Sequence, residues 1–142
     1  MTQKYYKKIK DALKDVPNGK IIINRHNDAH ENLIYNKDFH YCSDGKGLVE
    51  TYSVFPGIEL SFNYYYASRF DFQHEPVHSA MQINHCRDGR IGWEMQDHTS
   101  IYLCPGDLSL HTLHSCAEST MNLPLGYYQG VAVLIDLDIL TA

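Results

Sequence analysis

Residues 81–110 constrain the fold of this 142-residue chain more than any other stretch, because two strand-like runs and two tight corners follow one another within them. Asp88-Gly89 separates the two runs, and Asp-Gly in that position favours a two-residue type I′ turn. Pro105-Gly106-Asp107 marks a second corner. Short strands joined by such corners predict a β-sandwich or a β-barrel.

The two runs around Asp88-Gly89 are predicted to form a hairpin in which Arg87 faces Arg90. In that register one face carries His85, Gly92, Ile83 and Glu94, and the other carries Cys86, Ile91, Asn84, Trp93, Gln82 and Met95. Neither face is uniformly apolar. The mixture indicates that at least one face lines a cavity containing polar groups, with a loosely patterned outer strand as the alternative.

Further strands are predicted at residues 20–23, 33–35, 58–72, 101–103, 108–113 and 130–137. Within the longest run, apolar residues alternate with polar ones, so one face of a half-buried strand carries Ile58, Leu60, Phe62, Tyr64 and Tyr66. The predicted fold class is mainly β, a barrel built from residues 20–142.

A short amphipathic helix followed by a turn is predicted at residues 1–19. Tyr5, Ile9, Leu13 and Val16 recur at helical spacing, and Pro17-Asn18-Gly19 ends the pattern. This helix also carries the one basic cluster of the chain: Lys4, Lys7, Lys8, Lys10 and Lys14. Because acidic residues interrupt the cluster and the helix has an apolar stripe to bury, we expect a solvated helix face rather than a nucleic-acid-binding arm.

Composition limits the possible functions. The formal net charge of −5 has the wrong sign for a domain that neutralises phosphates, so we expect no DNA binding by this chain alone. The four cysteines include no C-x-x-C pair, which is typical of free thiols in a reducing cytosol. No signal peptide or membrane span is predicted, and the expected location is cytoplasmic.

Four segments taken together resemble the N-terminal cupin-like domain of AraC/XylS-family bacterial transcription regulators. They are residues 81–90, 102–108, 123–130 and 133–137, and the likeness extends over roughly residues 50–138. The resemblance implies a double-stranded β-helix, or jelly-roll, barrel behind a short N-terminal helix. It also implies a C-terminal domain with two helix-turn-helix units, which this chain lacks, so we expect an excised sensor domain rather than a freestanding barrel.

The same family resemblance allows a test for the metal site of other cupins. Aligned with their two metal-binding motifs, the chain has Pro76 and His78 at the first two histidines, Gln82 at the glutamate and Ala117 at the last histidine. One usual ligand therefore remains, and no metal or other cofactor is predicted. A non-standard site at His74 with His78, or at His111 with His114, would require a bulged strand.

The resemblance implies a domain that binds a small-molecule effector, or that forms a homodimer, and that controls DNA binding by the missing domain. We predict Tyr64, Tyr66, His78, Gln82 and Trp93 as the wall of its pocket, with a packed core as the alternative reading of each.

No catalytic residues are predicted, and the chain is expected not to be an enzyme. The alternatives are a cupin-type isomerase or dioxygenase, with His78 and Glu94 as an acid and base, and a barrel that only dimerises.

Overall fold

The computed structural model describes residues 9–27, 45–73, 80–94, 98–112 and 118–141. Their strands are β1 (Ile21–His26), β2 (Lys46–Phe55), β3 (Ile58–Tyr66), β4 (Arg69–Gln73), β5 (Ala80–Gly89), β6 (Ile91–Glu94), β7 (Ser100–Leu103), β8 (Leu108–Thr112), β9 (Glu118–Asn122) and β10 (Tyr127–Asp136). A short helix, α2 (Leu137–Thr141), follows β10. The predicted mainly β class is confirmed.

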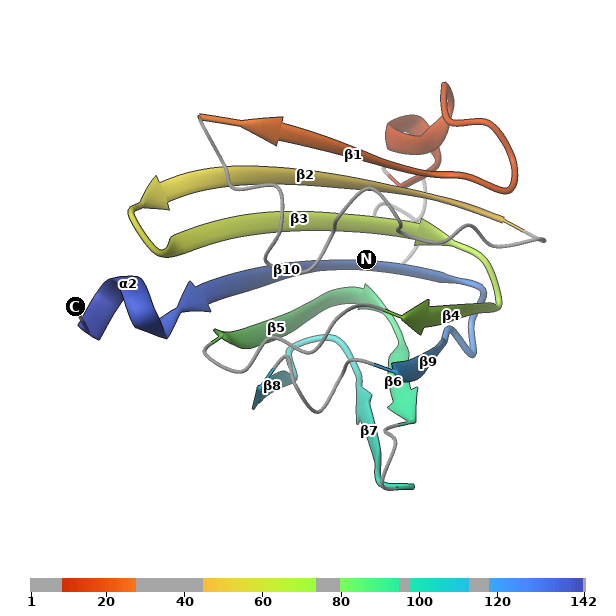
Figure 1. Ribbon diagram of the computed structural model, residues 1–142. Helices are drawn as coiled ribbons and strands as arrows, with labels where there is room; N and C mark the ends of the chain where they lie inside the picture. The colour runs from red at the N-terminus through yellow and green to blue at the C-terminus, as the bar shows by residue number, and fades with distance from the viewer. Residues whose placement is uncertain (1–8, 28–44, 74–79, 95–97, 113–117, 142) are drawn as a thin grey trace.

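The strands form two sheets that face each other (Figure 1). The larger has the order β1-β2-β3-β10-β5-β8, and the smaller has the order β4-β9-β6-β7. Strands β1 and β2 are parallel, whereas all other paired strands are antiparallel. Consecutive strands such as β3 and β4 belong to different sheets, as expected for a jelly roll.

The predicted hairpin at Asp88-Gly89 is wrong. Strand β5 pairs with β10 and β8, whereas β6 pairs with β9 and β7, so the chain crosses from one sheet to the other between β5 and β6. Gly89 has a φ of +80°, and its N–H donates to Asp88 Oδ1 at 2.8 Å. A Cβ at this position would overlap the Tyr127 carbonyl oxygen. The glycine therefore serves a tight corner between layers instead of a turn within one sheet.

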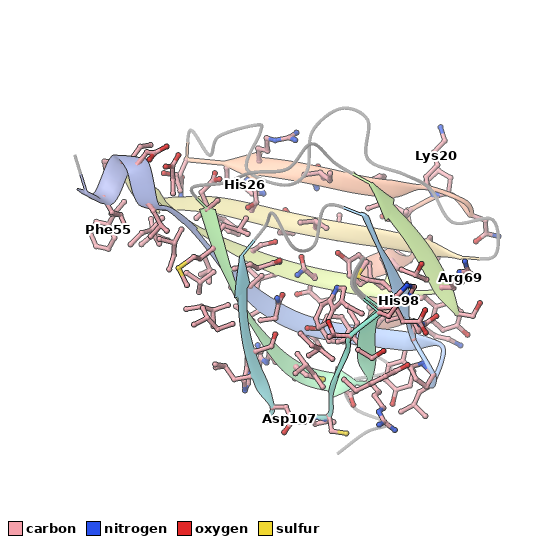
Figure 2. All side chains as sticks on the ribbon, turned by 60° about the horizontal axis from the view of Figure 1, so that its bottom comes forward. Lys20, His26, Phe55, Arg69, His98 and Asp107 are labelled. Carbon is pink, nitrogen blue, oxygen red and sulfur yellow. The ribbon has the colours of Figure 1, made fainter. Side chains whose placement is uncertain are left out.

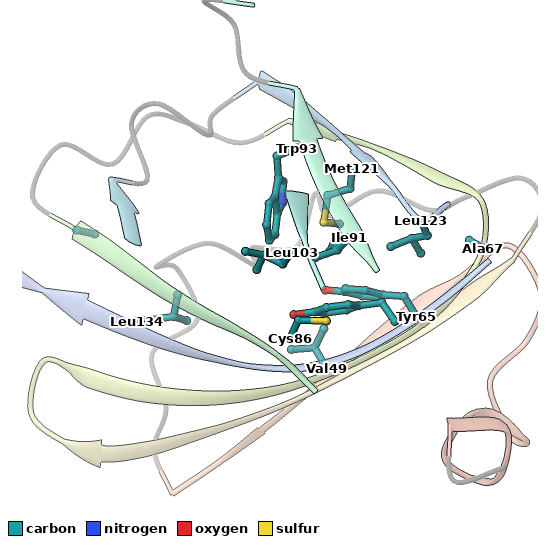
Figure 3. Packing of buried hydrophobic residues seen from close by; sticks show 12 residues of the cluster. Val49, Tyr65, Ala67, Cys86, Ile91, Trp93, Leu103, Met121, Leu123 and Leu134 are labelled. Atoms are coloured by element: carbon teal, nitrogen blue, oxygen red, sulfur yellow. The ribbon is translucent and has the colours of Figure 1, made fainter. Parts of the chain in front are cut away.

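An apolar core fills the space between the sheets at one end (Figure 3). Tyr65 and Tyr128 from the larger sheet stack with ring centroids 6.0 Å apart and planes inclined by 17°. The smaller sheet contributes Ile91, Trp93, Leu103 and Met121, all buried. We call the face of the six-stranded sheet that carries Tyr65 and Tyr128 its inner face.

The opposite, outer face of the six-stranded sheet is partly covered by the N-terminal segment. Residues 9–13 are helical, and Ile9, Leu13 and Val16 are buried against Tyr127. Leu48 and Tyr64 pack against the same cluster. None of the helices in the described parts of the chain is long and apolar enough to cross a membrane.

Candidate functional site

Strand β3 buries its polar side. Ile58, Leu60, Phe62, Tyr64 and Tyr66 share a face as predicted, but the buried positions of the strand are those between them. Glu59, Ser61 and Asn63 are 2%, 0% and 3% exposed, and they share the inner face with Tyr65 because side chains alternate along a strand. The expectation that the apolar side of this strand is its buried side is therefore corrected.

Neighbouring strands bury polar side chains on the same inner face. Strand β5 contributes Gln82 and Asn84, which alternate with half-buried residues and precede the buried Cys86. Thr51 of β2 and Ser109 of β8 are also buried. The inner face thus has an apolar half around Tyr65 and Tyr128 and a polar half toward the Glu59 end of β3.

Strand register brings these polar residues into adjacent rows across the sheet. Ser61 is paired with Thr51 on one side and Ala132 on the other, while Asn84 is paired with Ala132 and Ser109. The adjacent rows are Ser53, Glu59, Leu134 and Gln82 on one side, and Val49, Asn63, Gly130 and Cys86 on the other. On β10, Ala132 therefore stands between Ser61 and Asn84, and Leu134 stands between Glu59 and Gln82.

Some of the hydrogen-bond donors and acceptors in the polar half find partners within the protein, and others do not. The Ser61 hydroxyl donates to Asn63 Oδ1 at 2.8 Å, which fixes the amide orientation. The Ser109 hydroxyl has no hydrogen-bond partner among the residues that the structure describes. A buried hydroxyl without a partner costs about 1–3 kcal/mol, so an arriving polar molecule can recover that energy.

Cys86 lies at the boundary between the apolar and polar halves of the inner face, and its thiol is a weak nucleophile. Burial raises the pKa of its thiol to about 12, with smaller contributions from the nearby charges of Cys104, Asp88 and Asp107. The thiol donates weakly to the carbonyl oxygens of Asp88 and Gly89. Because the thiolate is the nucleophile, this cysteine has no role as a nucleophile at neutral pH.

The predicted corner at Pro105-Gly106-Asp107 closes the end of the layers near Cys86 (Figure 2). Gly106 N–H donates to the Cys86 carbonyl at 2.9 Å, and Cys86 N–H donates to the Asp107 carbonyl at 3.1 Å. Asp107 Oδ2 also accepts from Cys104 N–H at 2.8 Å. This corner fixes the positions of β5 and β8 relative to each other.

The structure places the predicted pocket residues in three different locations. Gln82 is in the polar half of the inner face, and Trp93, 7% exposed, packs in the apolar core. Tyr64 and Tyr66 are on the outer face, where Tyr66 lines a cavity of about 400 Å³ together with Lys10, Leu13, Asn18 and Lys46. His78 lies outside the described residues. The structure therefore does not bring Tyr64 and Tyr66 together with Gln82 and Trp93, and ligand binding by any of these residues remains a prediction.

Sequence reasoning missed Glu59, Ser61, Asn63, Asn84 and Ser109 as candidate site residues. The signal was present, because Glu59, Ser61 and Asn63 alternate as strictly as the apolar residues between them. A period of two fixes which residues share a face but does not fix which face points inward.

The prediction that the chain binds no metal is also untested. Within the described residues, no group of three or more His, Cys, Asp or Glu side chains is placed to hold a metal ion. His74, His78 and His114 lie outside those residues. For His111, the structure describes the backbone, which pairs with Gln82.

In sequence, the chain matches no protein-family model and no curated protein. In structure, it is similar to a cupin superfamily protein from Desulfitobacterium hafniense, at 13% identity and a TM-score of 0.50 over 63% of this chain and 76% of that one. KdgF from Halomonas sp. gives 14% identity and a TM-score of 0.50 over 63% and 78%. The putative ethanolamine utilization protein EutQ from Salmonella typhimurium gives 11% identity and 0.50 over 63% and 68%.

The expectation that the chain is not an enzyme is corrected by the match to KdgF, an enzyme, and at 14% identity this match leaves open whether the chain is itself an enzyme. Matches include an ectoine synthase from P. lautus, at 14% identity and a TM-score of 0.46 over 56% of this chain and 54% of that one. They also include an HTH_3 family transcriptional regulator from Vibrio cholerae, at 11% identity and 0.48, of which the chain spans 50%. The expectation rested on missing metal ligands and on the lack of recognisable nucleophile, phosphate-binding or acid/base motifs in the sequence, and it did not consider the carboxyl group of Glu59, which the structure buries.

Similarity at these identities establishes the fold and leaves the activity open. The two facing sheets with jelly-roll crossovers and the structural match to a cupin protein indicate the same fold. The described part of this chain has the cupin fold.

Proposed function

We propose that this chain binds a small polar organic molecule at the polar half of its inner face and acts as the sensing domain of a transcription regulator. The observation that carries the proposal is the burial of hydrogen-bonding side chains from four strands: Thr51, Glu59, Ser61, Asn63, Gln82, Asn84 and Ser109. Burying polar groups costs free energy unless they find partners, so a face used only for packing would be expected to be apolar.

The chemistry of these side chains favours a particular class of ligand. Amides and hydroxyls donate and accept hydrogen bonds, and Glu59 supplies the one carboxyl group of the set. The set contains no lysine or arginine that would neutralise an anion. A neutral or cationic molecule rich in hydroxyl or amino groups, such as a polyol or an amino sugar, therefore suits this face better than a carboxylate or a phosphate.

The regulatory part of the proposal is supported by the resemblance of residues 81–90 and 102–108 to the sensor domains of AraC/XylS-family regulators. A ligand that binds one conformation more tightly than another shifts the population between them. DNA contacts would come from a separate domain, because the net charge of −5 opposes binding to phosphates.

The test is a thermal-shift screen of sugars, polyols and amino alcohols, with carboxylates and phosphate esters as the contrasting group. A ligand present at about a hundredfold its dissociation constant stabilises the folded state by about 2.7 kcal/mol. The single tryptophan, Trp93, lies in the adjoining apolar half and gives a second readout by fluorescence.

A matched pair of variants then locates the binding site. Ser109→Ala is expected to weaken binding several-fold while raising the melting temperature of the free protein, because the buried hydroxyl that it removes has no partner among the described residues. Ser100→Ala, at an exposed position on the other sheet, should leave binding unchanged. No response to any hydroxyl or amino compound, or a response to anions only, would contradict the proposal.

A cupin-type enzyme is the second candidate, and the buried Glu59 carboxylate favours it. A carboxyl group among hydrogen-bonding side chains can act as a general acid or base when a substrate lies within reach. Once a ligand is known, Glu59→Gln separates the two functions. An enzyme would lose conversion of the bound compound, whereas a sensor would show no conversion before or after the change.

A further inference from the structure

The cavity on the outer face of the six-stranded sheet lies between the N-terminal segment and the strands beneath it. The N-terminal helix is at the end of the sheet where β2 begins and β3 ends (Figure 1). The cavity measures about 400 Å³ and is lined by Lys10 and Leu13 of the helix, Asn18 of the turn that follows, Lys46 of β2 and Tyr66 of β3. Small-molecule sites have volumes of roughly 300–1,000 Å³, so this cavity is large enough to hold one.

The fold fixes the walls of this cavity. Lys46 is paired with Tyr66 across β2 and β3, so the two side chains stand side by side on the outer face. The turn after the helix is joined to the start of β2, because Gly47 N–H donates to the Lys20 carbonyl at 3.0 Å. Leu13, 1% exposed, anchors the helix against the same face. The helix, the turn and the two strands are thus held together around the cavity.

The charge of the cavity lining is opposite to that of the whole chain. The formal net charge is −5, yet both charged residues of the lining are lysines, and no Asp or Glu is among the described residues that line it. Asp11 is two residues from Leu13, and residues two apart on a helix do not share a side. Two ammonium groups brought together from different elements repel each other, and a bound anion removes that repulsion.

The other lining residues specify the ligand beyond its charge. An asparagine amide and a tyrosine hydroxyl are donors, and the oxygens of an anion accept hydrogen bonds. Leu13 and the ring of Tyr66 supply apolar surface, and Tyr66 is 37% exposed, so its ring is accessible from solvent. An anion with a flat apolar body therefore matches the cavity better than a bare inorganic ion does.

We propose that this cavity is a second binding site, specific for a small organic anion such as an aromatic carboxylate, and that the anion fastens the N-terminal helix to the sheet. The carboxylate interacts with Lys10 and Lys46, and the apolar body packs on Leu13 and Tyr66. Because Lys10 belongs to the helix and Lys46 to β2, a ligand that contacts both binds only the conformation in which the helix is docked. The outer and inner sites thus select ligands of opposite charge.

The experiment is a thermal-shift titration at low ionic strength with benzoate, phenylacetate and cinnamate, each compared with its uncharged amide. The acids are expected to raise the melting temperature in a saturable way, because a ligand that binds only the folded state stabilises it. The amides should leave the melting temperature unchanged. Acetate, which has the charge without the apolar body, should bind more weakly than benzoate. Sodium chloride at the same ionic strength corrects for screening.

A matched pair of lysine variants locates the site. Lys46→Gln removes one ammonium group from a half-buried position of the lining and is expected to raise the dissociation constant of the tightest-binding acid at least about tenfold. Lys14→Gln is the control, because Lys14 is exposed in the same N-terminal segment and does not line the cavity. It changes the net charge equally and should leave binding unchanged. Circular dichroism checks that both variants remain folded.

Trypsin cleavage after Lys14 reports whether the anion fastens the helix. The bound acid should slow this cleavage in the wild type but not in the Lys46→Gln protein, a comparison that also controls for effects on trypsin itself. An anion response that Lys46→Gln abolishes belongs to the outer cavity, which keeps this test separate from the screen for inner-face ligands. No stabilisation by any of the three acids, equal stabilisation by acids and amides, binding unaffected by Lys46→Gln, or binding without slower cleavage would overturn the proposal.

Discussion

Gly130→Ala tests whether the stacking of Tyr65 and Tyr128 requires a residue without a side chain at position 130 of β10. The Tyr128 ring lies across Gly130, and a Cβ there would overlap the Tyr128 hydroxyl and lie 2.8 Å from the His85 carbonyl oxygen. Tyr128 is 1% exposed and stacked on Tyr65, so its ring has nowhere to move. The alanine must therefore displace a buried aromatic pair.

The expected cost follows from three contributions. Overpacking a core costs about 1–3 kcal/mol, and a lost aromatic pair costs about 0.5–1.5 kcal/mol. Replacing glycine by alanine in ordinary backbone returns about 0.4–1 kcal/mol by restricting the unfolded chain. The net loss is about 2 kcal/mol, which corresponds to a melting temperature lower by roughly 4–8 °C.

Gly92→Ala is the matched control for this prediction. A Cβ at Gly92 would overlap the Tyr102 ring, but that ring is 42% exposed and can swing into solvent. Its contact with Arg90, 5.3 Å from the ring centroid, is worth about 0.5–1 kcal/mol and offsets the gain from the backbone. Calorimetry should show a change within about 0.5 kcal/mol. A Gly130→Ala protein as stable as the wild type, or equal losses for both variants, would refute the reasoning.

Three further predictions concern the inner face. Ser61→Ala removes the hydroxyl that donates to Asn63 Oδ1 and should lower the free energy of unfolding in urea by about 1–3 kcal/mol, and an unchanged midpoint would mean that another donor replaces it. Cys86, whose pKa is raised to about 12 from 9.0, should be alkylated at pH 8 at least a hundredfold more slowly than the exposed Cys104, as peptide mass spectrometry would show. The raised pKa also means that the folded state prefers the protonated thiol, so its contribution to stability is lost as pH rises from about 9 towards 12, and a melting temperature independent of pH over that window would contradict this.

The hairpin at Asp88-Gly89 shows how a correct local signal can give a wrong connection. The sequence indicated a glycine with positive φ between two strands, and Gly89 has a φ of +80°. The same backbone conformation serves a hairpin turn and a corner between sheets. The outcome depends on β10 and β8, which occupy both edges of β5 and leave no edge for β6.

The candidate site also combines correct local predictions with a wrong tertiary assignment. The sequence grouped Gln82 and Asn84 with Cys86, and all three are buried on the inner face. It also placed Tyr64 and Tyr66 on one face of β3 but assigned them to the pocket wall, whereas the structure has them on the outer face. The choice between the two faces of β3 came from the packing of Tyr65 and Tyr128 in one core cluster with Trp93, Met121 and other residues of the smaller sheet, which are far from β3 in the chain.

The sequence by itself determined the mainly β class, several of the strands but not β2 or β9, the corner glycines and which residues of a strand share a face. These follow from backbone conformation and the period of two along a strand. Only the tertiary structure decided which strands pair and which face of each strand points inward. Inverting a strand leaves its alternation unchanged, so the two orientations of β3 differ only in what each face packs against. Its inner side meets the second layer and buries Glu59, Ser61 and Asn63, whereas its apolar side is left for the helix.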